Sequence, residues 1–213
     1  MPDTAKFQKA EGKKMSYIVI ASANAHKVEE YRELLKDQDV DLHSLADYPG
    51  FPGVEEDGTT FAENASIKAV AVSKYCDEPA FADDSGLEVM ALDGRPGIYS
   101  ARYAENDPAR RAKLLSELEG VTDRRARFVC VIAIAYNGEV IETFEGEVKG
   151  TIITEERGEG GFGYDPLFVP DGYDQTFAEM PQELKNKISH RAEAFRKAVE
   201  FIEEQMSVLG NEF

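Results

Sequence analysis

The chain has 213 residues, and its 41 Asp and Glu residues against 24 Lys and Arg residues give a formal net charge of −17. Proteins that bind long nucleic acids or anionic membranes use clustered Lys and Arg, so this composition argues against both kinds of partner. A small anionic ligand stays compatible if cationic side chains or a metal ion are concentrated in one pocket. The hydrophobic content of 42% is ordinary for a globular protein, and the length suits one domain of two lobes or two small domains.

Neither a targeting segment nor a membrane span is expected. Residues 1–15 are polar and lack the apolar core of a secretory signal, and the longest apolar run, Phe128–Tyr136, is too short to cross a bilayer. We interpret Met1–Lys14 as a flexible lead-in. Cys76 and Cys130 lie in apolar stretches, which favours two core thiols in a reducing compartment, and hence a cytoplasmic protein, over a disulfide or a zinc site.

The first part of the chain predicts a strand, a helix and a second strand. Tyr17–Ala21 is a short apolar run rich in β-branched residues, as expected for a strand buried on both faces. A polar turn follows, and apolar residues then recur at helical spacing over residues 28–35. Asp41–Leu45 predicts a second strand, and Asp47–Gly58 predicts a loop because it is rich in proline, glycine and acidic residues.

The next segment predicts a helix followed by a short strand. Thr60 begins a capping box, and apolar residues mark one face of a helix over residues 61–76, which Pro79 ends. Ala80–Ala82 predicts a short buried strand. We expect the chain to turn sharply at Asp83–Gly86, because the glycine frees the backbone.

Two strong local signals follow. Asp107, with a proline directly after it, predicts the N-cap of a helix that ends at Gly120. Phe128–Tyr136 predicts a buried strand, and Asn137-Gly138 is the strongest short hairpin signal, so Glu139–Glu147 is expected to return antiparallel beside it. The predicted sheet is therefore mixed.

The remaining segments complete an α/β fold. Thr151–Thr154 predicts a further strand, Glu155–Gly163 a glycine-rich loop, and an apolar stripe over Phe195–Met206 a C-terminal helix. The chain has no internal repeat and no low-complexity linker. This favours one continuous sheet with helical flanks over separable domains, and we treat residues 15–213 as a single domain.

The turn Ser22–Lys27 carries groups that bind phosphate. A strand that leads through a polar turn into a helix presents backbone N–H groups and the positive end of the helix dipole, here beside a hydroxyl, an amide and a lysine. The turn lacks the Walker pattern. Taken alone, it is explained more simply as an ordinary strand-to-helix turn with a surface lysine.

Two acidic segments suggest a metal site. Asp83 and Asp84 are adjacent carboxylates whose repulsion a divalent cation would relieve, although N-capping aspartates in a polar turn explain them equally well. The loop Glu55–Asp57 reads as a solvated charge run, with one member as a candidate ligand. Mg²⁺ prefers one or two carboxylates together with waters and phosphate oxygens, so one residue from each segment would suffice.

Two later segments offer contacts for a base and for phosphates. In Gly160–Pro166, glycines surround Phe162, whose ring is a stacking surface for a base; a hairpin with core aromatics is the alternative. Lys185 and the segment Ser189–Arg191 bring together cationic donors for carbonyl or phosphate oxygens. Helix capping by the serine, with bases on the surface, is the alternative there.

Together these motifs resemble the inosine triphosphate pyrophosphatase family, also called non-canonical purine NTP pyrophosphatases or XTP/dITP diphosphatases. The matching segments follow the family's order from Tyr17 to about Arg191 and are IVIASANAHKVEEY, EEDGTTFAENASIKA, FADDSGLEV, GRPGIYSARY, ARFVCVIA, GGFGYDPLFVP and ISHR. The resemblance implies the family's fold, an α/β protein with a mixed, elongated twisted sheet whose helical flanks form two lobes around a nucleotide cleft. It also implies a homodimer.

Carried over residue by residue, the resemblance implies a site for phosphates. Ser22 to Lys27 would hold the triphosphate, with Asn24 and Lys27 as the best matches. Asp84 corresponds to the family's proton acceptor and metal ligand, and Ser85 beside it would touch the substrate.

The resemblance also implies a metal ligand and a nucleoside pocket. Glu56 aligns with a glutamate that binds Mg²⁺, and Glu55 is the competing choice. The nucleoside and the rest of the pocket would be contacted by Phe162, Gly163, Tyr164, Asp165, Lys185, His190 and Arg191.

The phosphate loop departs from the family at three positions. The family commonly has Thr where Ser22 stands, Asn or Gly at the position of Ala23, and Gly at that of His26. Ser22 keeps the hydroxyl, whereas Ala23 and His26 are assigned no contacts.

The implied reaction is Mg²⁺-dependent hydrolysis of ITP, dITP or XTP between the α- and β-phosphates, giving a monophosphate and pyrophosphate. Physically it needs a water aligned on the α-phosphorus, a base for its proton and cations for the leaving group. Donors aimed at position 6 of the base would stay unpaired against ATP, which explains selection for the 6-oxo purines. The residue that excludes guanine and the preference among the three nucleotides do not follow from the sequence.

Two other classes of function are weighed against this one. A non-catalytic nucleotide-binding regulator has little use for Asp83 and Asp84. A house-cleaning pyrophosphatase for other modified nucleotides would keep the acids but has no reason to keep the segment Ser189–Arg191. In every case we expect free nucleotides as ligands, and neither nucleic acid nor membrane as a partner.

Overall fold

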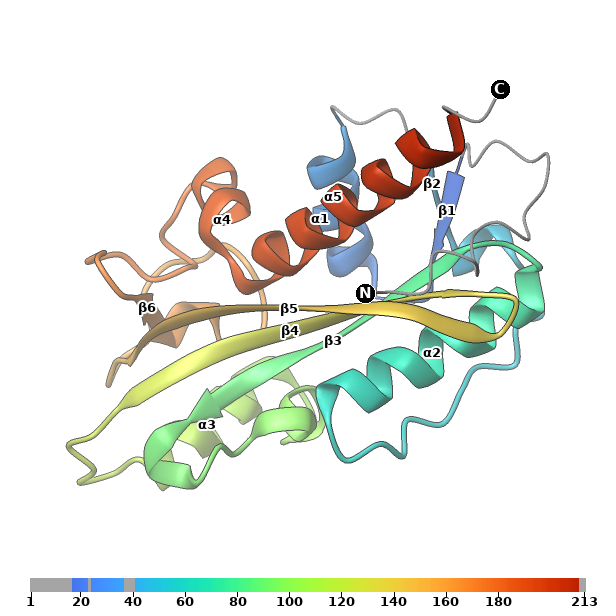
Figure 1. The fold of residues 1–213 in the computed structure, drawn as a ribbon. Helices are drawn as coiled ribbons and strands as arrows, with labels where there is room; N and C mark the ends of the chain where they lie inside the picture. Colours follow the sequence, from blue (N-terminus) through green and yellow to red (C-terminus); the bar gives the residue numbers. More distant parts are fainter. Residues whose placement is uncertain (1–16, 23, 37–40, 211–213) are drawn as a thin grey trace. The chain divides into compact units, whose positions relative to one another are not determined.

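A computed structural model describes residues 17–22, 24–36 and 41–210, so the predicted lead-in Met1–Lys14 lies outside the described residues (Figure 1). Within them, six strands form one sheet in the order β2-β1-β3-β4-β5-β6. The strands are β1 Tyr17–Ile20, β2 Asp41–Ser44, β3 Ala80–Val89, β4 Arg125–Tyr136, β5 Glu139–Ile152 and β6 Phe168–Pro170. The α-helices are α1 Ala25–Leu35, α2 Phe61–Cys76, α3 Asp107–Glu117, α4 Gln182–Ile188 and α5 His190–Gly210, and a 3-10 helix, η4, covers Gly97–Arg102.

The sheet is mixed, as predicted. Strand β1 pairs in parallel with β2 and with β3, whereas β5 and β6 pair antiparallel. The predicted hairpin is confirmed, because β4 and β5 are neighbours joined by Asn137 and Gly138 alone, both with positive φ. A side chain at position 138 would collide with Lys74, so this turn needs its glycine.

The chain divides into two compact units. Unit 1 comprises Met1–Asp84, Val131–Glu145 and Ala194–Phe213, and unit 2 comprises Ser85–Cys130 and Gly146–Glu193. Strand β3 therefore belongs to unit 1 as far as Asp84 and to unit 2 from Ser85 onward.

In unit 1, the sheet carries helices on both faces: α1 and α5 on one, α2 on the other (Figure 1). On the first face, Tyr31 of α1 packs edge-on against Phe81 of β3 at 5.1 Å between ring centroids, and Phe195 of α5 contacts both rings. On the second face, small apolar residues of α2 pack against the strands: Ala65, Ala69 and Val72. Because side chains alternate along a strand, Phe81 and Ala82 of β3 face different helices.

The core of unit 2 is built from longer side chains. Leu87 and Val89 of β3 lie in one buried cluster with Leu114 and Leu118 from α3 and its C-terminal end. Aromatic rings fill the same cluster: Phe128, Tyr164, Phe168 and Phe177.

The sharp turn predicted at Asp83–Gly86 is wrong, because β3 continues through these residues to Val89. The local composition is poor for a strand. Burial of Leu87 and Val89, both 0% exposed, overrides it, and the Ser100 hydroxyl accepts a hydrogen bond from the backbone N–H of Leu87 at 2.9 Å.

Smaller differences concern the ends of elements. The N-cap of α3 is Asn106, one residue before the predicted Asp107, and its side chain accepts from the N–H of Ala109 at 2.9 Å. Thr151 and Ile152 extend β5, so Thr151–Thr154 is not a separate strand. Strand β6 and helix α4 were not predicted.

Neither Cys76 nor Cys130 is part of a disulfide; Cys130 is buried and Cys76 is half-buried. None of the helices in the described part of the chain combines the length and the apolar character that crossing a membrane requires.

Candidate functional site

The two adjacent aspartates of β3 point to opposite faces of the strand. Asp83 lies on the same face as Phe81, where Nζ of Lys27 from α1 contacts its Oδ2 at 2.8 Å. Asp84 lies on the face of α2, where Nδ2 of Asn64 donates to its Oδ2 at 3.1 Å. The alternation of a strand thus gives each carboxylate a partner from a different helix.

Lys27 and Asp83 form a buried ion pair. The Asp83 side chain is fully inaccessible and the Lys27 side chain is 15% exposed. We predicted Lys27 as a phosphate ligand. In the structure its ammonium already neutralises the Asp83 carboxylate, so a phosphate that binds Lys27 would share the ammonium with Asp83.

A second lysine, Lys68, lies between the two acids that we predicted as metal ligands. Its Nζ is 3.1 Å from Oε2 of Glu56 and 3.7 Å from Oδ1 of Asp84. The structure therefore brings together Glu56 of the acidic loop and Asp84 of the aspartate pair, one residue from each segment as we expected for a metal site. We call Lys27, Glu56, Asn64, Lys68, Asp83 and Asp84 the acidic cluster.

Burial and charge act in opposite directions within the acidic cluster. Burial raises the pKa of Asp84, and the nearby Lys68, Asn64 and Lys27 only partly offset it. Burial also works against the charged form of Lys68, but the carboxylates of Asp83, Asp84 and Glu56 outweigh it, so the pKa of Lys68 is raised. Three carboxylates therefore face two ammonium groups, which leaves the cluster one negative charge in excess when all are ionised.

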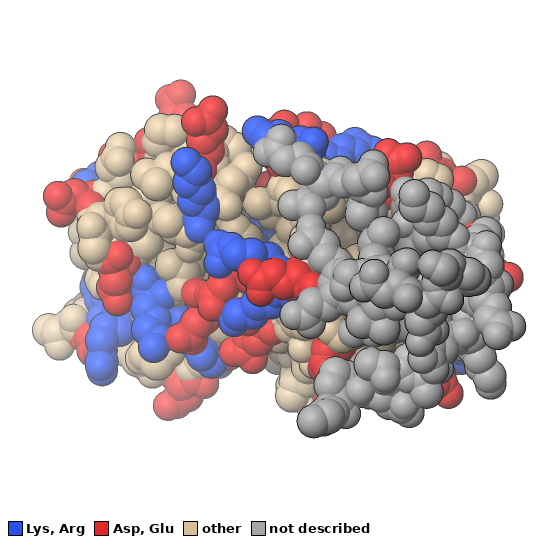
Figure 2. Space-filling model, turned by 45° about the horizontal axis from the view of Figure 1, so that its top comes forward, with Lys and Arg blue, Asp and Glu red and all other residues tan. Residues whose placement is uncertain are grey.

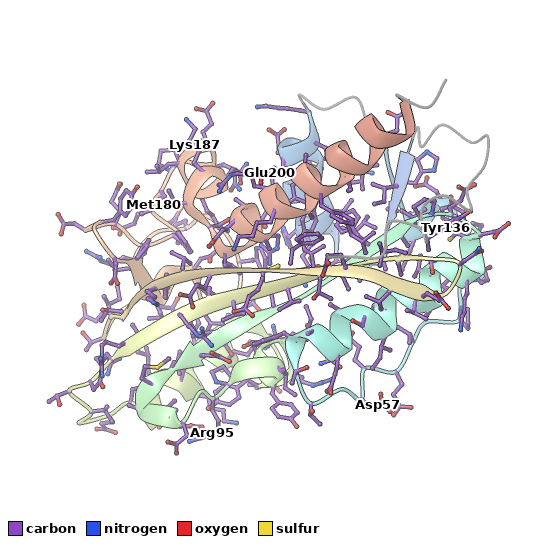
Figure 3. All side chains as sticks on the ribbon, viewed as in Figure 1. Asp57, Arg95, Tyr136, Met180, Lys187 and Glu200 are labelled. Carbon is purple, nitrogen blue, oxygen red and sulfur yellow. The ribbon has the colours of Figure 1, made fainter. Side chains whose placement is uncertain are left out.

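The loop that carries Glu56 is held against α2. The N–H of Gly58 donates to Oδ1 of Asn64 at 2.9 Å, while the amide nitrogen of Asn64 binds Asp84. A Cβ on Gly58 would lie 2.6 Å from that oxygen, so only glycine fits there. Glu55 and Asp57 are exposed, and Figure 3 shows Asp57 on the loop that precedes α2. The geometry thus distinguishes Glu56 from its two neighbours.

The donors of the acidic cluster fit a hard divalent cation. Glu56 and Asp84 offer carboxylate oxygens, the ligands that Mg²⁺ prefers. Among the described residues, no group of three or more Asp, Glu, His or Cys side chains is arranged to hold a metal ion. Two carboxylates would leave the remaining coordination positions of a hard divalent cation to water or phosphate oxygens.

The turn before α1 has its donors satisfied internally. Asn24 caps the helix: its Oδ1 accepts from the N–H groups of His26 at 3.0 Å and Lys27 at 3.4 Å, and Ser22 Oγ accepts from the N–H of Asn24 at 3.2 Å. Ser22 and Asn24 thus shape the turn that we predicted to bind phosphate. Ala23 lies outside the described residues.

Unit 2 contains a second group of predicted residues, centred on Phe162. Its ring is half-buried, and Nζ of Lys185 lies 5.1 Å and the Arg191 guanidinium carbon 5.5 Å from its centroid. Lys185 also forms a buried ion pair with Oδ2 of Asp165 at 2.8 Å. Two cationic side chains thus lie near one aromatic ring, whose π face attracts positive charge. We call Phe162, Asp165, Lys185, His190 and Arg191 the aromatic cluster.

The segment Ser189–Arg191 contributes in three different ways. Ser189 accepts from the N–H of Ala192 at 3.1 Å and so caps the start of α5, the alternative that we had weighed for it. His190 is buried and stacks on Phe128 at 4.8 Å between centroids. Nη2 of Arg191 donates to Oγ of Ser85 at 3.3 Å, which brings Ser85 to the aromatic cluster.

Gly163 and Tyr164 differ in their surroundings. Tyr164 is 3% exposed, its hydroxyl donates to the backbone oxygen of Ser100 at 3.0 Å, and burial raises its pKa. Its side chain therefore belongs to the core of unit 2, the alternative that we had considered for this segment. Gly163 has a φ of 61°, a backbone conformation that favours glycine.

Sequence reasoning missed Asn64 and Lys68. Both lie on α2, four residues apart and therefore on one helix face. Asn64 directly precedes the fully buried Ala65, and it is itself only 1% exposed. The signal in the sequence was a pair of polar residues beside the apolar stripe of a helix. It becomes informative only once their partner on the sheet, Asp84, is known.

A mixed α/β sheet with two acids on one strand and a lysine beside them from each flanking helix offers groups that can bind a cation and phosphate oxygens. A profile of the Ham1 family matches residues 18–201. The chain belongs to the Ham1 family, which confirms the resemblance drawn from the motifs.

Named relatives match over almost their whole length. A dITP/XTP pyrophosphatase of Desulforamulus reducens is 54% identical over 190 residues, which cover 87% of this chain and 94% of the relative. One of Bacillus subtilis is 47% identical over 194 residues, covering 89% and 98%.

Solved structures agree with the fold. The Ham1 protein of Staphylococcus aureus superposes with a TM-score of 0.80 at 44% identity, covering 89% of this chain and 99% of that protein. A HAM1 protein of Coxiella burnetii gives 0.82 at 40% identity, covering 89% and 100%.

Proposed function

We propose that this protein hydrolyses the non-canonical purine nucleoside triphosphates ITP, dITP and XTP to the monophosphate and pyrophosphate, and so removes them from the nucleotide pool. The observation that carries the proposal is the 54% identity to a relative named dITP/XTP pyrophosphatase over 94% of its length. The acidic cluster adds the parts that the reaction needs.

The acidic cluster would act on the phosphates. Glu56 and Asp84 would hold Mg²⁺, which neutralises phosphate oxygens and lowers the pKa of a nearby water. Asp84 would accept the proton of the attacking water at a carboxylate oxygen.

The lysines of the acidic cluster would complete the charge balance. Lys68 lies within 4 Å of both proposed metal ligands, so its ammonium would relieve the repulsion between their carboxylates before substrate arrives. When a triphosphate binds, Lys68 and Lys27 would also neutralise its oxygens, and Ser22 and Asn24 before α1 would donate hydrogen bonds to them.

The aromatic cluster would select the base. The Phe162 ring would stack on the purine, the turn Phe162–Asp165 would contact the nucleoside, and Ser85, Lys185, His190 and Arg191 would supply donors around it. The acidic and aromatic clusters are continuous along the chain, since Asp84 and Ser85 are consecutive residues of β3. We assign both clusters to one substrate on the family resemblance, which carries the residues of both over from one site.

One assay tests the proposal. The protein is incubated with Mg²⁺ and, separately, with ITP, XTP, dITP, ATP, GTP and dUTP, and released pyrophosphate is measured. We expect release from the first three and much slower release from ATP and GTP. Release from dUTP alone would support a pyrophosphatase for other modified nucleotides, and no release from any of them would support a binding protein.

We propose two further properties with this function. Cys76 and Cys130, neither of which is part of a disulfide, support a reducing compartment such as the cytoplasm. A homodimer is proposed from the family resemblance, and its test is the mass of the protein in solution.

A further inference from the structure

Two side chains of helix α3 bind the backbone of Gly163, in the turn that carries Phe162. Oδ2 of Asp107 accepts from the N–H of Gly163 at 2.7 Å, and Nη1 of Arg111 donates to the carbonyl oxygen of Gly163 at 2.9 Å. Both backbone groups of one glycine are thus bound by side chains one helical turn apart. All of these residues belong to unit 2.

The side chains of Asp107 and Arg111 are themselves held by charged partners. Nη1 of Arg110 binds Oδ1 of Asp107 at 2.6 Å, and Nε of Arg110 donates to the backbone oxygen of Ala104 at 3.2 Å. Nε of Arg111 lies 2.9 Å from Oε1 of Glu156. Each oxygen of Asp107 therefore has one donor, and neither Asp107 nor Arg111 can swing away without losing a charged partner.

Gly163 is connected to the Phe162 ring through a turn that two hydrogen bonds close. The N–H of Phe162 donates to Oδ2 of Asp165 at 2.9 Å, and the N–H of Asp165 donates to the carbonyl oxygen of Phe162 at 3.2 Å. Gly163 lies between these two residues with a φ of 61°, a conformation that only the surrounding bonds and the missing side chain make favourable. Holding Gly163 therefore fixes the direction of the Phe162 backbone.

We propose that Asp107 and Arg111 are positioning residues, which set the orientation of the turn Phe162–Asp165 and thereby the affinity for the base. This inference rests on the proposed function, since it takes that turn to bind the nucleoside. The bonds described above join both residues to partners in unit 2. Their loss should therefore weaken recognition of the nucleoside and leave recognition of the phosphates unchanged.

The expected size follows from the kind of bond that is lost. Hydrogen bonds to charged groups contribute enough that losing one changes an equilibrium about tenfold to a hundredfold. We expect Asp107→Ala and Arg111→Ala each to raise KM for ITP by about tenfold, with a smaller change in kcat. Asp107→Asn keeps one acceptor oxygen for the N–H of Gly163 but loses the charge that binds Arg110, so its effect should be intermediate.

The experiment compares two product inhibitors on each variant. Inhibition of ITP hydrolysis by inosine monophosphate reports recognition of the nucleoside, and inhibition by pyrophosphate reports recognition of the phosphates. The matched control is Asp123→Ala, which removes the carboxylate of an exposed ion pair with Arg125 in the same unit. Thermal unfolding is measured for every variant, so that only folded protein is compared.

The inference is supported if inosine monophosphate binds about tenfold more weakly to Asp107→Ala and Arg111→Ala while pyrophosphate binds as before. Equal weakening of both inhibitors, or of neither, overturns it. If Asp107→Ala does not fold, the same criterion is applied to Asp107→Asn and Arg111→Ala. A wild-type protein that releases no pyrophosphate from ITP would instead overturn the proposed function.

Discussion

Replacing Lys68 by methionine tests how the acidic cluster is balanced. The substitution keeps an unbranched side chain, one atom shorter, and removes its charge, so Glu56 and Asp84 lose the ammonium that lies within 4 Å of both. Lys68 and Asp84 are each only 13% exposed, so water cannot replace that partner fully. We expect the variant to fold but to be less stable.

The magnitude can be worked out from the geometry. An ion pair near 4 Å with an effective dielectric constant near 20 is worth about 4 kcal/mol. Part of this is offset, because the variant no longer removes an ammonium group from water, so we expect a net loss of about 2 kcal/mol. An exposed pair such as Lys36 and Glu33, 3.5 Å apart on α1, should contribute well under 1 kcal/mol, roughly the median for surface pairs.

The loss should depend on pH in a defined direction. Burial already raises the pKa of Asp84, and Lys68 partly offsets the shift, so the pKa rises further without the lysine. The ionised form of Asp84 then opposes folding above that pKa, and this penalty disappears as pH falls through it. Destabilisation by Lys68→Met should therefore be larger at about pH 8 than at about pH 5.

Urea unfolding of the wild type, Lys68→Met and Lys36→Met at these two pH values measures the effect. The reasoning would be refuted if Lys68→Met lost no more stability than Lys36→Met, or if its loss were the same at both pH values.

Three further predictions concern activity. Asp84→Asn should fold normally and lose at least about a hundredfold in kcat, the usual contribution of a general base, and near wild-type turnover would remove Asp84 from that role. A chelator should abolish pyrophosphate release from ITP and added Mg²⁺ should restore it; activity that persists after dialysis against the chelator would exclude the metal. Gly161→Ala should raise KM for ITP and cost about 1 kcal/mol or more of stability, because a Cβ there would collide with the Asp165 carboxylate at a φ of 70°. An unchanged KM would mean that this turn does not shape the substrate site.

Much of the fold could be predicted from local signals. The capping box at Thr60 and the hairpin at Asn137-Gly138 were both confirmed, because each depends on bonds within a few residues of the chain. The course of β3 could not be predicted, since Asp83–Gly86 favours a turn and only the burial of Leu87 and Val89 draws the strand onward. Tertiary packing decided that segment against its local preference.

The candidate site divides in the same way. The motifs drew attention to Asp84, Glu56 and Phe162, whose residue types suggest chemistry without knowledge of their neighbours. Lys68 and Asp107 are ordinary charged helix residues in the sequence, and their meaning lies in partners that are many positions away. From the sequence, Asp107 was explained as an N-cap. In the structure Asn106 is the N-cap, and the Asp107 carboxylate accepts a hydrogen bond from the N–H of Gly163.

The alternation at Asp83 and Asp84 has a consequence for how such a site can change. Each carboxylate is neutralised by a lysine on a separate helix, Lys27 on α1 and Lys68 on α2. A substitution on α2 can therefore remove the ammonium beside Asp84 while the ion pair of Asp83 with Lys27 is retained, and the reverse holds for α1. The charges of the four groups still act on one another, since Lys27 also lowers the pKa of Asp84 and Asp83 also raises the pKa of Lys68. Evolution or protein engineering can thus change the contacts of one carboxylate at a time, with the electrostatic effect felt by both.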